Sequence, residues 1–321
     1  MEFLAGGEPR RPRGTKGPTR DGSPKGAGQA GREREAPVTI ALAPGPRAAD
    51  DAPRPWPSPG ALTGTRRKTD VIRLDSLGVR LIDRRRGDRR WVVRGVSLEV
   101  PQGCIYGLIG PGASGKSVLL KALVGLLPVE AGSVELGETE VAQASALELE
   151  MLRRKVGMAF QNSALFEHLS VYDNIAFPLR RLFAPPEAEV RDKVAERLAC
   201  VTLTGFEGRL PPGLSGGQKK RVAFARATIT SPPILLLDEP AAGLDPVTSQ
   251  RLFELIRREV SASGATCVVV SSDLDRLLPI CDRVGVIVHG ELLFDGTVDA
   301  AKRAGDARVH QFVHGLPDGP L

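Results

Sequence analysis

The sequence predicts an α/β fold with a mostly parallel sheet, and three observations support this prediction. A short apolar segment at 104–109 runs into the glycine-rich turn GPGASG and then into a helix-like segment, in the order strand, loop, helix. Strand-like and helix-like segments alternate between residues 234 and 297, as expected of parallel strands joined by helices. The composition changes near residue 71, so we expect the folded domain to start there.

Residues 1–70 are expected to form a disordered tail. They contain 11 Pro and 11 Gly, a share above that at which unpatterned Pro- and Gly-rich chains usually stay unfolded. They also carry 13 basic and 8 acidic side chains, which accounts for +5 of the net charge of +6. The remaining 31 basic and 30 acidic side chains nearly cancel. This balance argues against a nucleic-acid-binding role for the folded part.

Several other classes of protein are excluded by the composition. No apolar run approaches the roughly 18–20 residues that a membrane-spanning helix needs. The tail lacks the apolar segment of a secretory signal, and its acidic residues do not fit a transit peptide. The cysteines show no CxxC and no Cys/His ligand spacing, so we interpret them as buried, reduced thiols of a cytosolic protein and expect neither zinc nor disulfides: Cys104, Cys200, Cys267 and Cys281.

The first predicted elements are a hairpin, a strand and a helix. Apolar residues alternate at 71–81 and at 91–99, with the charged stretch 83–90 between them, which predicts a β-hairpin with a long polar tip. The strand at 104–109 follows. The apolar segment 116–127, KSVLLKALVGLL, predicts a helix that Pro128 stops.

The rest of the chain is predicted as a helical insert followed by further strands. Residues 150–230 are expected to be helical, with loops at five prolines. Strands are expected again at 234–238, 265–271 and 283–289, with a helix at 248–261. The prolines are Pro178, Pro185, Pro186, Pro211 and Pro212.

Two motifs point to nucleotide chemistry. Gly110, Gly115, Lys116 and Ser117 fit GxxxxGK[ST], in which backbone N–H groups approach phosphates, the lysine reaches the β- and γ-phosphates and the hydroxyl ligates magnesium. Downstream, ILLLDEP at 234–240 predicts a buried strand that ends in two carboxylates. The first of them, Asp238, is placed to hold Mg²⁺, and Glu239 to polarise an attacking water.

With the segment LSGGQKKRVAFARA at 214–227, the chain resembles the nucleotide-binding domain of ABC transporters over residues 71–300. The resemblance implies a P-loop NTPase fold that has a RecA-like core, an antiparallel β-subdomain and a helical subdomain at about 150–225. The domain is expected to span 71–303, with a C-terminal tail at 304–321.

The resemblance also implies the site residues. Two copies are expected to pair head to tail, so that the signature of one closes over ATP bound by the other. ATP is expected to contact Gly110, Pro111, Gly112, Ala113, Ser114, Gly115, Lys116, Ser117, Val118, Ser215, Gly216, Gly217, Asp238 and Asp245. Hydrolysis is expected to use Glu239, Lys116, Gln161 and Ser272, and Mg²⁺ to be held by Ser117, Gln161 and Asp238.

Three segments resemble, more narrowly, the ATPase of Mla/Mce-type lipid transporters: GKSVLLKALVGLL, the run FQNSALFEHLSVYDNIAFPLR at 160–180, and DARVHQFVHGLPDGP at 306–320. This implies a homodimer on the inner face of the cell membrane, with an MlaE-like permease, an MCE-domain lipid-binding protein and phospholipid as cargo. Ordinary packing shared by many ABC domains is the alternative explanation of 160–180, and it leaves importers or exporters of other substrates open.

The chain departs from the family pattern at two places. Where the family has Ser-His-Asp after a strand, this chain has Ser272, and none of the histidines lies in register: His168, His289, His310 and His314. The loss of imidazole favours the alternative of a degenerate subunit that binds ATP and hardly hydrolyses it. The aromatic residue that usually stacks on adenine falls on Leu81, with Trp91 as the other candidate.

A soluble ABC protein that acts on DNA or ribosomes is the third hypothesis. Against it, the segment between Ser117 and Ser215 contains neither heptads nor a long coiled-coil insertion.

Overall fold

The computed structural model describes residues 72–82 and 87–321. The expected tail at 1–70 and much of the predicted hairpin tip therefore lie outside the described residues. In chain order the elements are β1 (Ile72–Ile82), β2 (Arg89–Val100), β3 (Ile105–Ile109), α1 (Lys116–Leu123), β4 (Ala131–Leu136), β5 (Thr139–Glu140), α2 (Ala146–Arg153), β6 (Val156–Ala159), α3 (Val171–Leu182), α4 (Glu187–Cys200), η2 (Pro211–Gly213), α5 (Gly216–Thr228), β7 (Ile234–Asp238), α6 (Pro246–Ser263), β8 (Thr266–Val270), α7 (Leu274–Leu277), η3 (Leu278–Ile280), β9 (Arg283–Val288), β10 (Glu291–Thr297), α8 (Val298–Lys302) and α9 (Ala307–His314).

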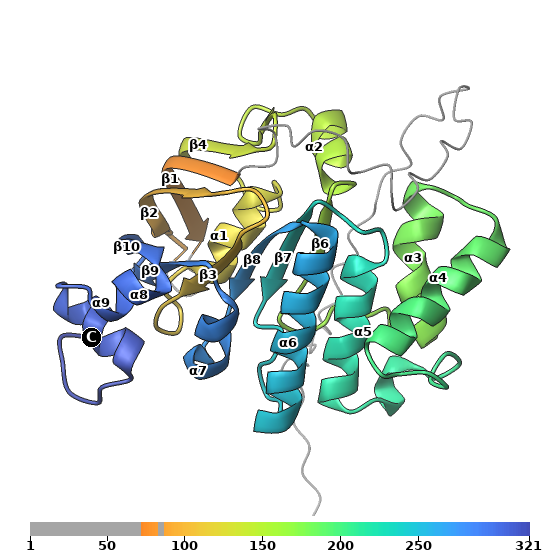
Figure 1. Cartoon of the computed structure of the whole chain (residues 1–321). Coiled ribbons are helices and arrows are strands. Elements are labelled where there is room, and N and C mark those ends of the chain that lie inside the picture. The colour runs from red at the N-terminus through yellow and green to blue at the C-terminus, as the bar shows by residue number, and fades with distance from the viewer. Residues whose placement is uncertain (1–71, 83–86) are drawn as a thin grey trace, which may run out of the picture. The chain divides into compact units, whose positions relative to one another are not determined.

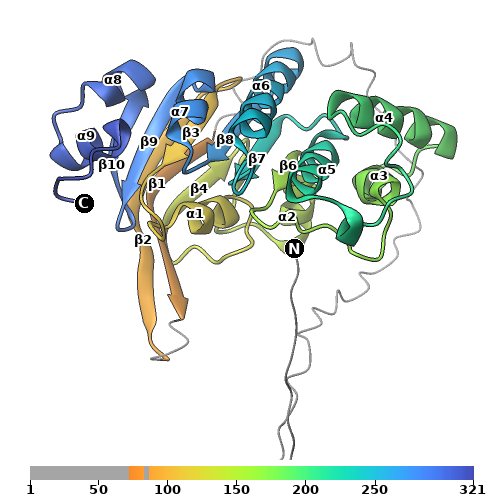
Figure 2. The same cartoon turned by 90° about the horizontal axis from the view of Figure 1, so that it is seen from below.

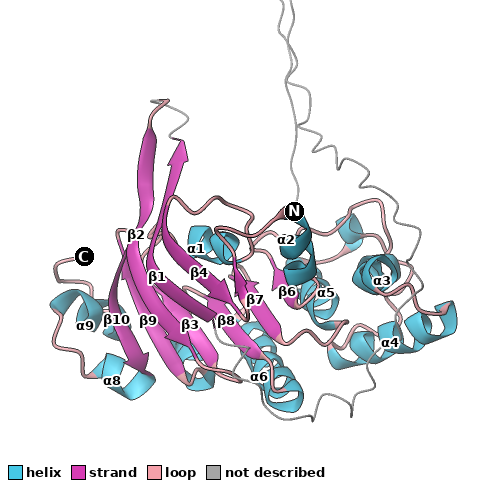
Figure 3. Cartoon of the chain, turned by 90° about the horizontal axis from the view of Figure 1, so that it is seen from above, coloured by secondary structure: helices cyan, strands magenta, loops and turns pink. Residues whose placement is uncertain are grey.

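Within the described residues the strands form two sheets, which confirms the predicted α/β fold with an antiparallel β-subdomain. One sheet is antiparallel, in the order β2-β1-β4-β5, and the other has the order β10-β9-β3-β8-β7-β6. In the second sheet β9, β3, β8, β7 and β6 pair in parallel, and β10 adds an antiparallel edge. The strands of both sheets are seen together in Figure 1 and Figure 3, where α3, α4 and α5 are grouped beyond β6.

Alternate side chains of the parallel strands enter two different apolar cores. On β7, Leu235 and Leu237 pack with α6 and the helical subdomain, whereas Leu236 faces α1 and the antiparallel sheet. The same alternation on β3 and β8 follows from the two-residue period of a strand. Figure 2 shows α6 and α1 on opposite sides of these strands. The strands are therefore buried on both faces, which explains why ILLL is continuously apolar.

Two element boundaries differ from the predictions. The helix expected at 116–127 ends at Leu123, because Gly125 takes φ 63° and its N–H bonds back to Ala122. The stretch 150–230 is not all helical, since Val156–Ala159 forms β6 and pairs in parallel with β7. A strand of four residues is too short to be told from a helical segment by its periodicity.

Two further expectations, the loop at Pro178 and the burial of all four cysteines, were wrong. Pro178 lies inside α3 rather than in a loop, because burial of one apolar face of the helix outweighs the hydrogen bond that proline removes. The C-terminal segment contains α9, with Val309 fully buried. Among the free cysteines, Cys200 is exposed. Burial does raise the pKa of the Cys104 thiol to about 11, which keeps that thiol protonated and unreactive.

The helical subdomain is tied to α6 by an ion pair. The Arg197 guanidinium on α4 lies 2.5 Å from the Glu259 carboxylate on α6, with 13% and 14% of the two side chains exposed. No helix of the described part of the chain is long and apolar enough to cross a membrane.

The loop before α3 is held by one buried amide. Asn174 is 0% exposed, and its Oδ1 accepts a hydrogen bond from the Phe166 N–H at 2.9 Å. Its Nδ2 donates to the carbonyl oxygens of Phe166, Leu169 and Ser170, each at 3.0 Å. The Asn174 amide thus bonds the Phe166 N–H and shares its two N–H donors among three carbonyls of the loop 166–170, so the loop takes its shape from Asn174.

We predict that Asn174→Ala lowers the free energy of unfolding by about 1–3 kcal/mol, because buried carbonyls lose their donor. Urea unfolding measures this change. Gln250→Ala is the matched control, since Gln250 is exposed and, among the described residues, its amide bonds only to Glu254 on the same helix. Equal midpoints for Asn174→Ala and the wild type would contradict the prediction.

Candidate functional site

The loop between β3 and α1 contains the GxxxxGK[ST] residues and folds closely against two strands. Gly110 has φ 149° and Gly115 has φ 102°, conformations that residues with a side chain rarely adopt. A Cβ at Gly110 would lie 1.9 Å from the Ile287 carbonyl oxygen, and one at Gly115 would lie 2.8 Å from the Val92 carbonyl oxygen. Only glycine fits at these two positions, so the loop is a preformed backbone cradle.

The Lys116 ammonium lies inside this cradle. Lys116 is 8% exposed, and its Nζ donates to the carbonyl oxygens of Gly110 at 2.9 Å and Pro111 at 2.7 Å. It also lies 3.2 Å from the Ser114 hydroxyl. Burial lowers the pKa of Lys116, while the carboxylates of Glu239 and Asp238 oppose that change. The loop therefore holds a cation whose partners are its own carbonyl groups.

Other members of the expected ATP set lie around the cradle. Ala113 takes φ 59°, and Val118 is partly buried against the core beneath the antiparallel sheet. The Ser114 carbonyl accepts a hydrogen bond from the Gly290 N–H at 3.1 Å. This places the β9–β10 turn, which includes His289, beside the loop, a proximity that the chain order does not reveal.

Ser117 and Asp238 meet at the carboxyl edge of the parallel sheet. The Ser117 hydroxyl donates to Asp238 Oδ1 at 2.8 Å, and Asp238 is 2% exposed at the end of β7. Gln161 follows β6, the neighbouring parallel strand, and is exposed. Hydroxyl, carboxylate and amide oxygens are the donors that Mg²⁺ prefers. The donor set and its place beside the cradle therefore fit a magnesium site.

Glu239 has a strained backbone. Its φ is 48°, which costs a residue with a side chain of order 1–3 kcal/mol and persists only where the surroundings enforce it. The Glu239 N–H donates to the Val270 carbonyl of β8 at 2.9 Å. Burial raises the pKa of the Glu239 carboxyl, and hydrogen bonds from Ser272 and the charge of Lys116 partly offset this. This combination of burial and strain is common at catalytic carboxylates.

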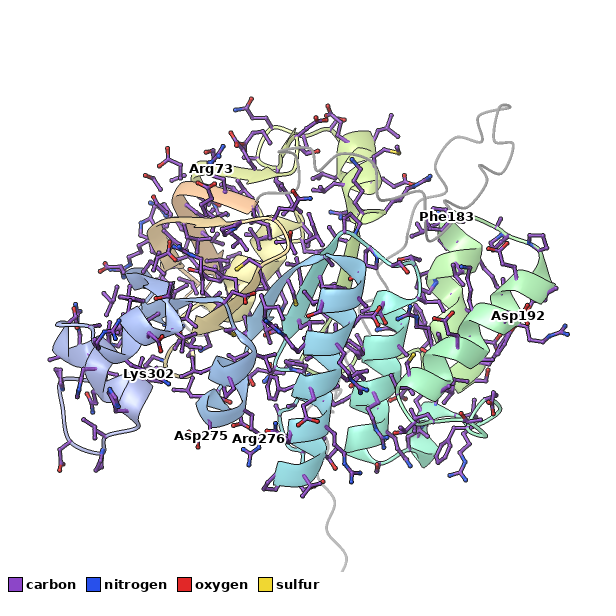
Figure 4. The ribbon with its side chains drawn as sticks, in the orientation of Figure 1. Arg73, Phe183, Asp192, Asp275, Arg276 and Lys302 are labelled. Atoms are coloured by element: carbon purple, nitrogen blue, oxygen red, sulfur yellow. The ribbon has the colours of Figure 1, made fainter. Side chains whose placement is uncertain are left out.

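Ser272 reaches Glu239 in the structure. Its hydroxyl donates to Glu239 Oε2 at 3.3 Å. The next residue, Asp273, pairs with Arg276, whose Nε donates to the Pro246 carbonyl at 3.2 Å. Figure 4 shows Arg276 at the foot of α7, next to α6. The loop after β8 is thus joined both to Glu239 and to the start of α6.

Lys220 is a residue of this site that the sequence reasoning missed. It lies on α5, and its Nζ donates to the Glu239 carbonyl oxygen at 3.0 Å and also to the Gln161 carbonyl oxygen. The only sequence signal for Lys220 is the basic run KKR at 219–221. Such a run on a helix usually indicates a solvent-exposed face, so it did not point to this role.

The signature residues lie at the start of α5. The Ser215 hydroxyl caps the helix by accepting from the Gln218 N–H at 3.3 Å. A Cβ at Gly217 would meet Leu244 and Thr248 near the start of α6. Within one chain, the described hydrogen bonds do not join this segment to the Lys116 cradle. Gly216 is exposed, so these N–H groups are available to a second molecule.

Asp245 acts as the N-cap of α6. Its Oδ1 accepts from the N–H groups of Val247 at 3.1 Å and Thr248 at 2.9 Å. A hydrogen bond from the Thr248 side chain, followed by the backbone hydrogen bonds from Thr248 and Val247, lowers the pKa of Asp245. The carboxylate therefore fixes the start of α6 beside Gly217.

The two adenine candidates differ in their surroundings. The Arg80 guanidinium lies 4.0 Å from the Trp91 ring centroid, and Arg80 and Trp91 are cross-strand partners. A Cβ at Gly78 would lie 2.7 Å from Trp91. Trp91 therefore packs against Arg80 and Gly78 within the hairpin, whereas Leu81 is the cross-strand partner of Arg90, and both candidates are partly buried.

An apolar cavity of about 260 Å³ lies between β6, α3 and α5. Phe166 and Phe177 line this cavity, with their ring centroids 4.8 Å apart. Phe166 is 36% exposed and Phe177 is 42% exposed. Exposed aromatic side chains around a hollow are typical of a protein-binding surface.

Comparison with known proteins agrees with this geometry. Residues 93–242 match the family model described as ABC transporter. The chain is 36% identical over 237 residues to the intermembrane phospholipid transport system ATP-binding protein MlaF of Haemophilus influenzae, which covers 74% of this chain and 89% of that protein. It is 35% identical over 232 residues to MlaF of Escherichia coli K12, with 72% and 86% covered.

A mycobacterial relative is longer than the matched region. The probable ribonucleotide transport ATP-binding protein mkl of Mycobacterium tuberculosis H37Rv is 39% identical over 226 residues, which cover 70% of this chain and 63% of that protein. The match thus spans less than two thirds of that relative's length.

Solved structures with a similar fold include the ATP-binding cassette MJ0796, a dimer in a post-hydrolysis state bound to ADP and Pi. It has a TM-score of 0.66 and 28% identity, covering 71% of this chain and 98% of that one. CbiO1 of Clostridium perfringens, part of the transporter complex cbiONQ, has a TM-score of 0.64 and 26% identity, with 77% and 95% covered.

We predict that Glu239→Gln stabilises the chain at neutral pH and not under acid. Because the pKa of Glu239 is higher in the folded chain than in the unfolded one, ionisation favours unfolding. This unfavourable contribution is absent below the unfolded pKa and complete above the folded pKa. The gain in Tm should therefore grow as the pH rises from about 4, near the pKa of an unfolded glutamate, toward neutral pH.

Thermal unfolding across that pH range measures the gain. Glu254→Gln, a change at an exposed glutamate of α6, is the matched control. A gain from Glu239→Gln that does not change with pH would show that strain or packing, rather than the buried charge, is responsible.

Proposed function

The chain belongs to the ABC transporter family as an ATP-binding protein of the MlaF type, and we propose that it hydrolyses ATP to energise lipid transport. The observation that carries the proposal is the group of Lys116, Ser117, Asp238 and Glu239 at one sheet edge. A buried cation, two carboxylates and a preformed cradle together are what phosphoryl transfer requires.

The roles follow from the positions of the side chains. Lys116 exchanges its bonds with loop carbonyls for the β- and γ-phosphates, so its charge is delivered without a large movement. Ser117 and Asp238, with Gln161, would hold magnesium, which when bound neutralises phosphate charge. Glu239 orients the attacking water, since its carboxylate is fixed by Ser272 and by its backbone contacts.

The signature segment completes the site from a second copy. Ser215, Gly216 and Gly217 present a helix N-terminus, which is a general anion-binding feature. In one chain Gly217 lies against Leu244 and Thr248 near the start of α6, and in our proposal each copy supplies one half of two shared sites. Head-to-tail pairing of two copies would join each cradle to a signature, with Asp245 fixing the start of α6 beside it.

Phospholipid is the cargo that we propose, because two relatives named for phospholipid transport match over most of their length. The partners would be an MlaE-like permease and an MCE-domain protein, which places the chain at the inner face of the cell membrane. The cavity beside Phe166 and Phe177 offers an apolar surface for the permease. The mycobacterial relative is named for a different cargo, a ribonucleotide.

A second candidate function is an ATP-binding subunit that hardly turns over. The specific observation in its favour is Ser272, because a hydroxyl cannot provide the reach or charge of an imidazole. The intact Glu239 and Lys116 oppose this alternative.

We predict that Glu239→Gln binds ATP, stops hydrolysis and accumulates as a closed dimer, because the composite sites form and are not resolved by hydrolysis. Light scattering with Mg-ATP measures the mass. Lys116→Ala is the control, since it should remain monomeric under the same conditions. A monomer at every protein concentration, with and without the permease, would refute the shared site.

We predict that Ser272→His raises kcat by roughly ten- to a thousand-fold, the effect of one contact to developing charge. ATP affinity should change little, because the Lys116 cradle supplies most of the binding. Steady-state hydrolysis measures both quantities, and Ser272→Ala shows what the present hydroxyl contributes. If the wild type and Ser272→His both match Glu239→Gln, even with the permease, the chain is the binding-only subunit.

A further inference from the structure

Lys220 is the side chain that joins the signature helix to both loops of the hydrolytic site. Its Nζ donates to the Glu239 carbonyl oxygen at 3.0 Å and to the Gln161 carbonyl oxygen. Lysine has three N–H donors and no acceptor, so two donors are committed to these backbone groups. The contacts are made from α5, an element of the helical subdomain, to loops of the core sheet.

The partly buried position of the Lys220 ammonium is unfavourable unless the two carbonyl oxygens accept its hydrogen bonds. Burial lowers the pKa of Lys220, and the carboxylates of Glu239 and Asp238 act in the opposite sense. A half-buried ammonium loses part of its hydration, and the two carbonyl oxygens replace the lost water. A lysine that is fully exposed to water would not need two carbonyl oxygens as fixed acceptors.

Glu239 needs this support because its backbone is strained. With φ at 48°, the Glu239 peptide is held at its N–H by Val270 of β8 and at its carbonyl by Lys220. The side chain is held by Ser272. Three neighbouring elements therefore fix one residue, and Lys220 provides the contact from outside the core sheet.

The same helix also holds the residues that follow Gln161 in this loop. Arg226 of α5 donates to the carbonyl oxygens of Ser163 and Ala164, both at 2.8 Å. Lys220 and Arg226 together fix this loop to α5. Of these two, only Lys220 also contacts Glu239.

We propose that Lys220 is a positioning residue that sets the Glu239 and Gln161 peptides relative to α5, so that the position of the helical subdomain determines whether the site can hydrolyse ATP. This inference rests on the proposed hydrolytic function. Any displacement of α5 is passed to both carbonyls, and a small misplacement of Glu239 changes kcat while the cradle around Lys116 still binds nucleotide.

The test compares Lys220→Met, Lys220→Arg and Lys219→Met in the full chain. Methionine keeps the aliphatic stem of lysine and removes the donors, whereas arginine keeps donors within reach. Lys219 is the matched control, because it lies next to Lys220 at similar exposure and its side chain makes no hydrogen bond or ion pair within the described residues.

We expect Lys220→Met to lower kcat by roughly 10- to 100-fold, the scale of a misplaced catalytic group. KM and ATP affinity should stay within about twofold, because the mutation leaves the Lys116 cradle unchanged. Lys220→Arg should recover most of the rate, and Lys219→Met should behave as the wild type. An unchanged kcat in Lys220→Met would overturn the positioning role. So would a fall in kcat that is accompanied by a comparable loss of ATP affinity and by a lower Tm.

Amide hydrogen exchange gives a second readout that does not need turnover. Lys220→Met should speed exchange in peptides that cover 160–164 and 238–244, and Lys219→Met should not. Equal exchange in the two variants would also overturn the proposal. If the wild type hydrolyses no more ATP than Glu239→Gln, the proposed function fails, and the exchange result alone decides the role of Lys220.

Discussion

The burial of charged groups at the carboxyl edge of the parallel sheet is the constraint on which this structure depends. Lys116, Asp238 and Glu239 lie where two apolar cores meet, and none of them is stable there without polar partners. The surrounding elements supply those partners: loop carbonyls for Lys116, the Ser117 hydroxyl for Asp238, and Ser272 for Glu239. These hydrogen bonds compensate the desolvation of the charged groups.

Most of the fold could be predicted because the sequence signals were local. The continuous apolar run before Asp238 and the turn between Gly110 and Gly115 each specify a strand or loop from neighbouring residues, and both are confirmed. β6 and the position of Pro178 were missed because tertiary packing decides them. The early end of α1 depends on a glycine at φ 63°, a signal that the apolar pattern concealed.

The site divides in the same way. The motifs predicted Lys116, Ser117, Asp238 and Glu239 as site residues, and the structure brings these four side chains together. Lys220 was not found, because its role is defined by two carbonyls that lie 59 and 19 residues away along the chain. The same is true of the Gly290 contact with Ser114. Residues that act through backbone groups leave no side-chain pattern in a sequence.

The alternation of β7 between two cores has a consequence for how this chain can change by descent. Leu235 and Leu237 face one core and Leu236 the other, and Asp238 ends the series. Inserting or deleting one residue within the strand would exchange the two faces and turn the carboxylate away from Ser117. Substitutions of similar volume are tolerable there, but changes of length are not. We therefore expect insertions and deletions to be tolerated in surface turns rather than within this strand.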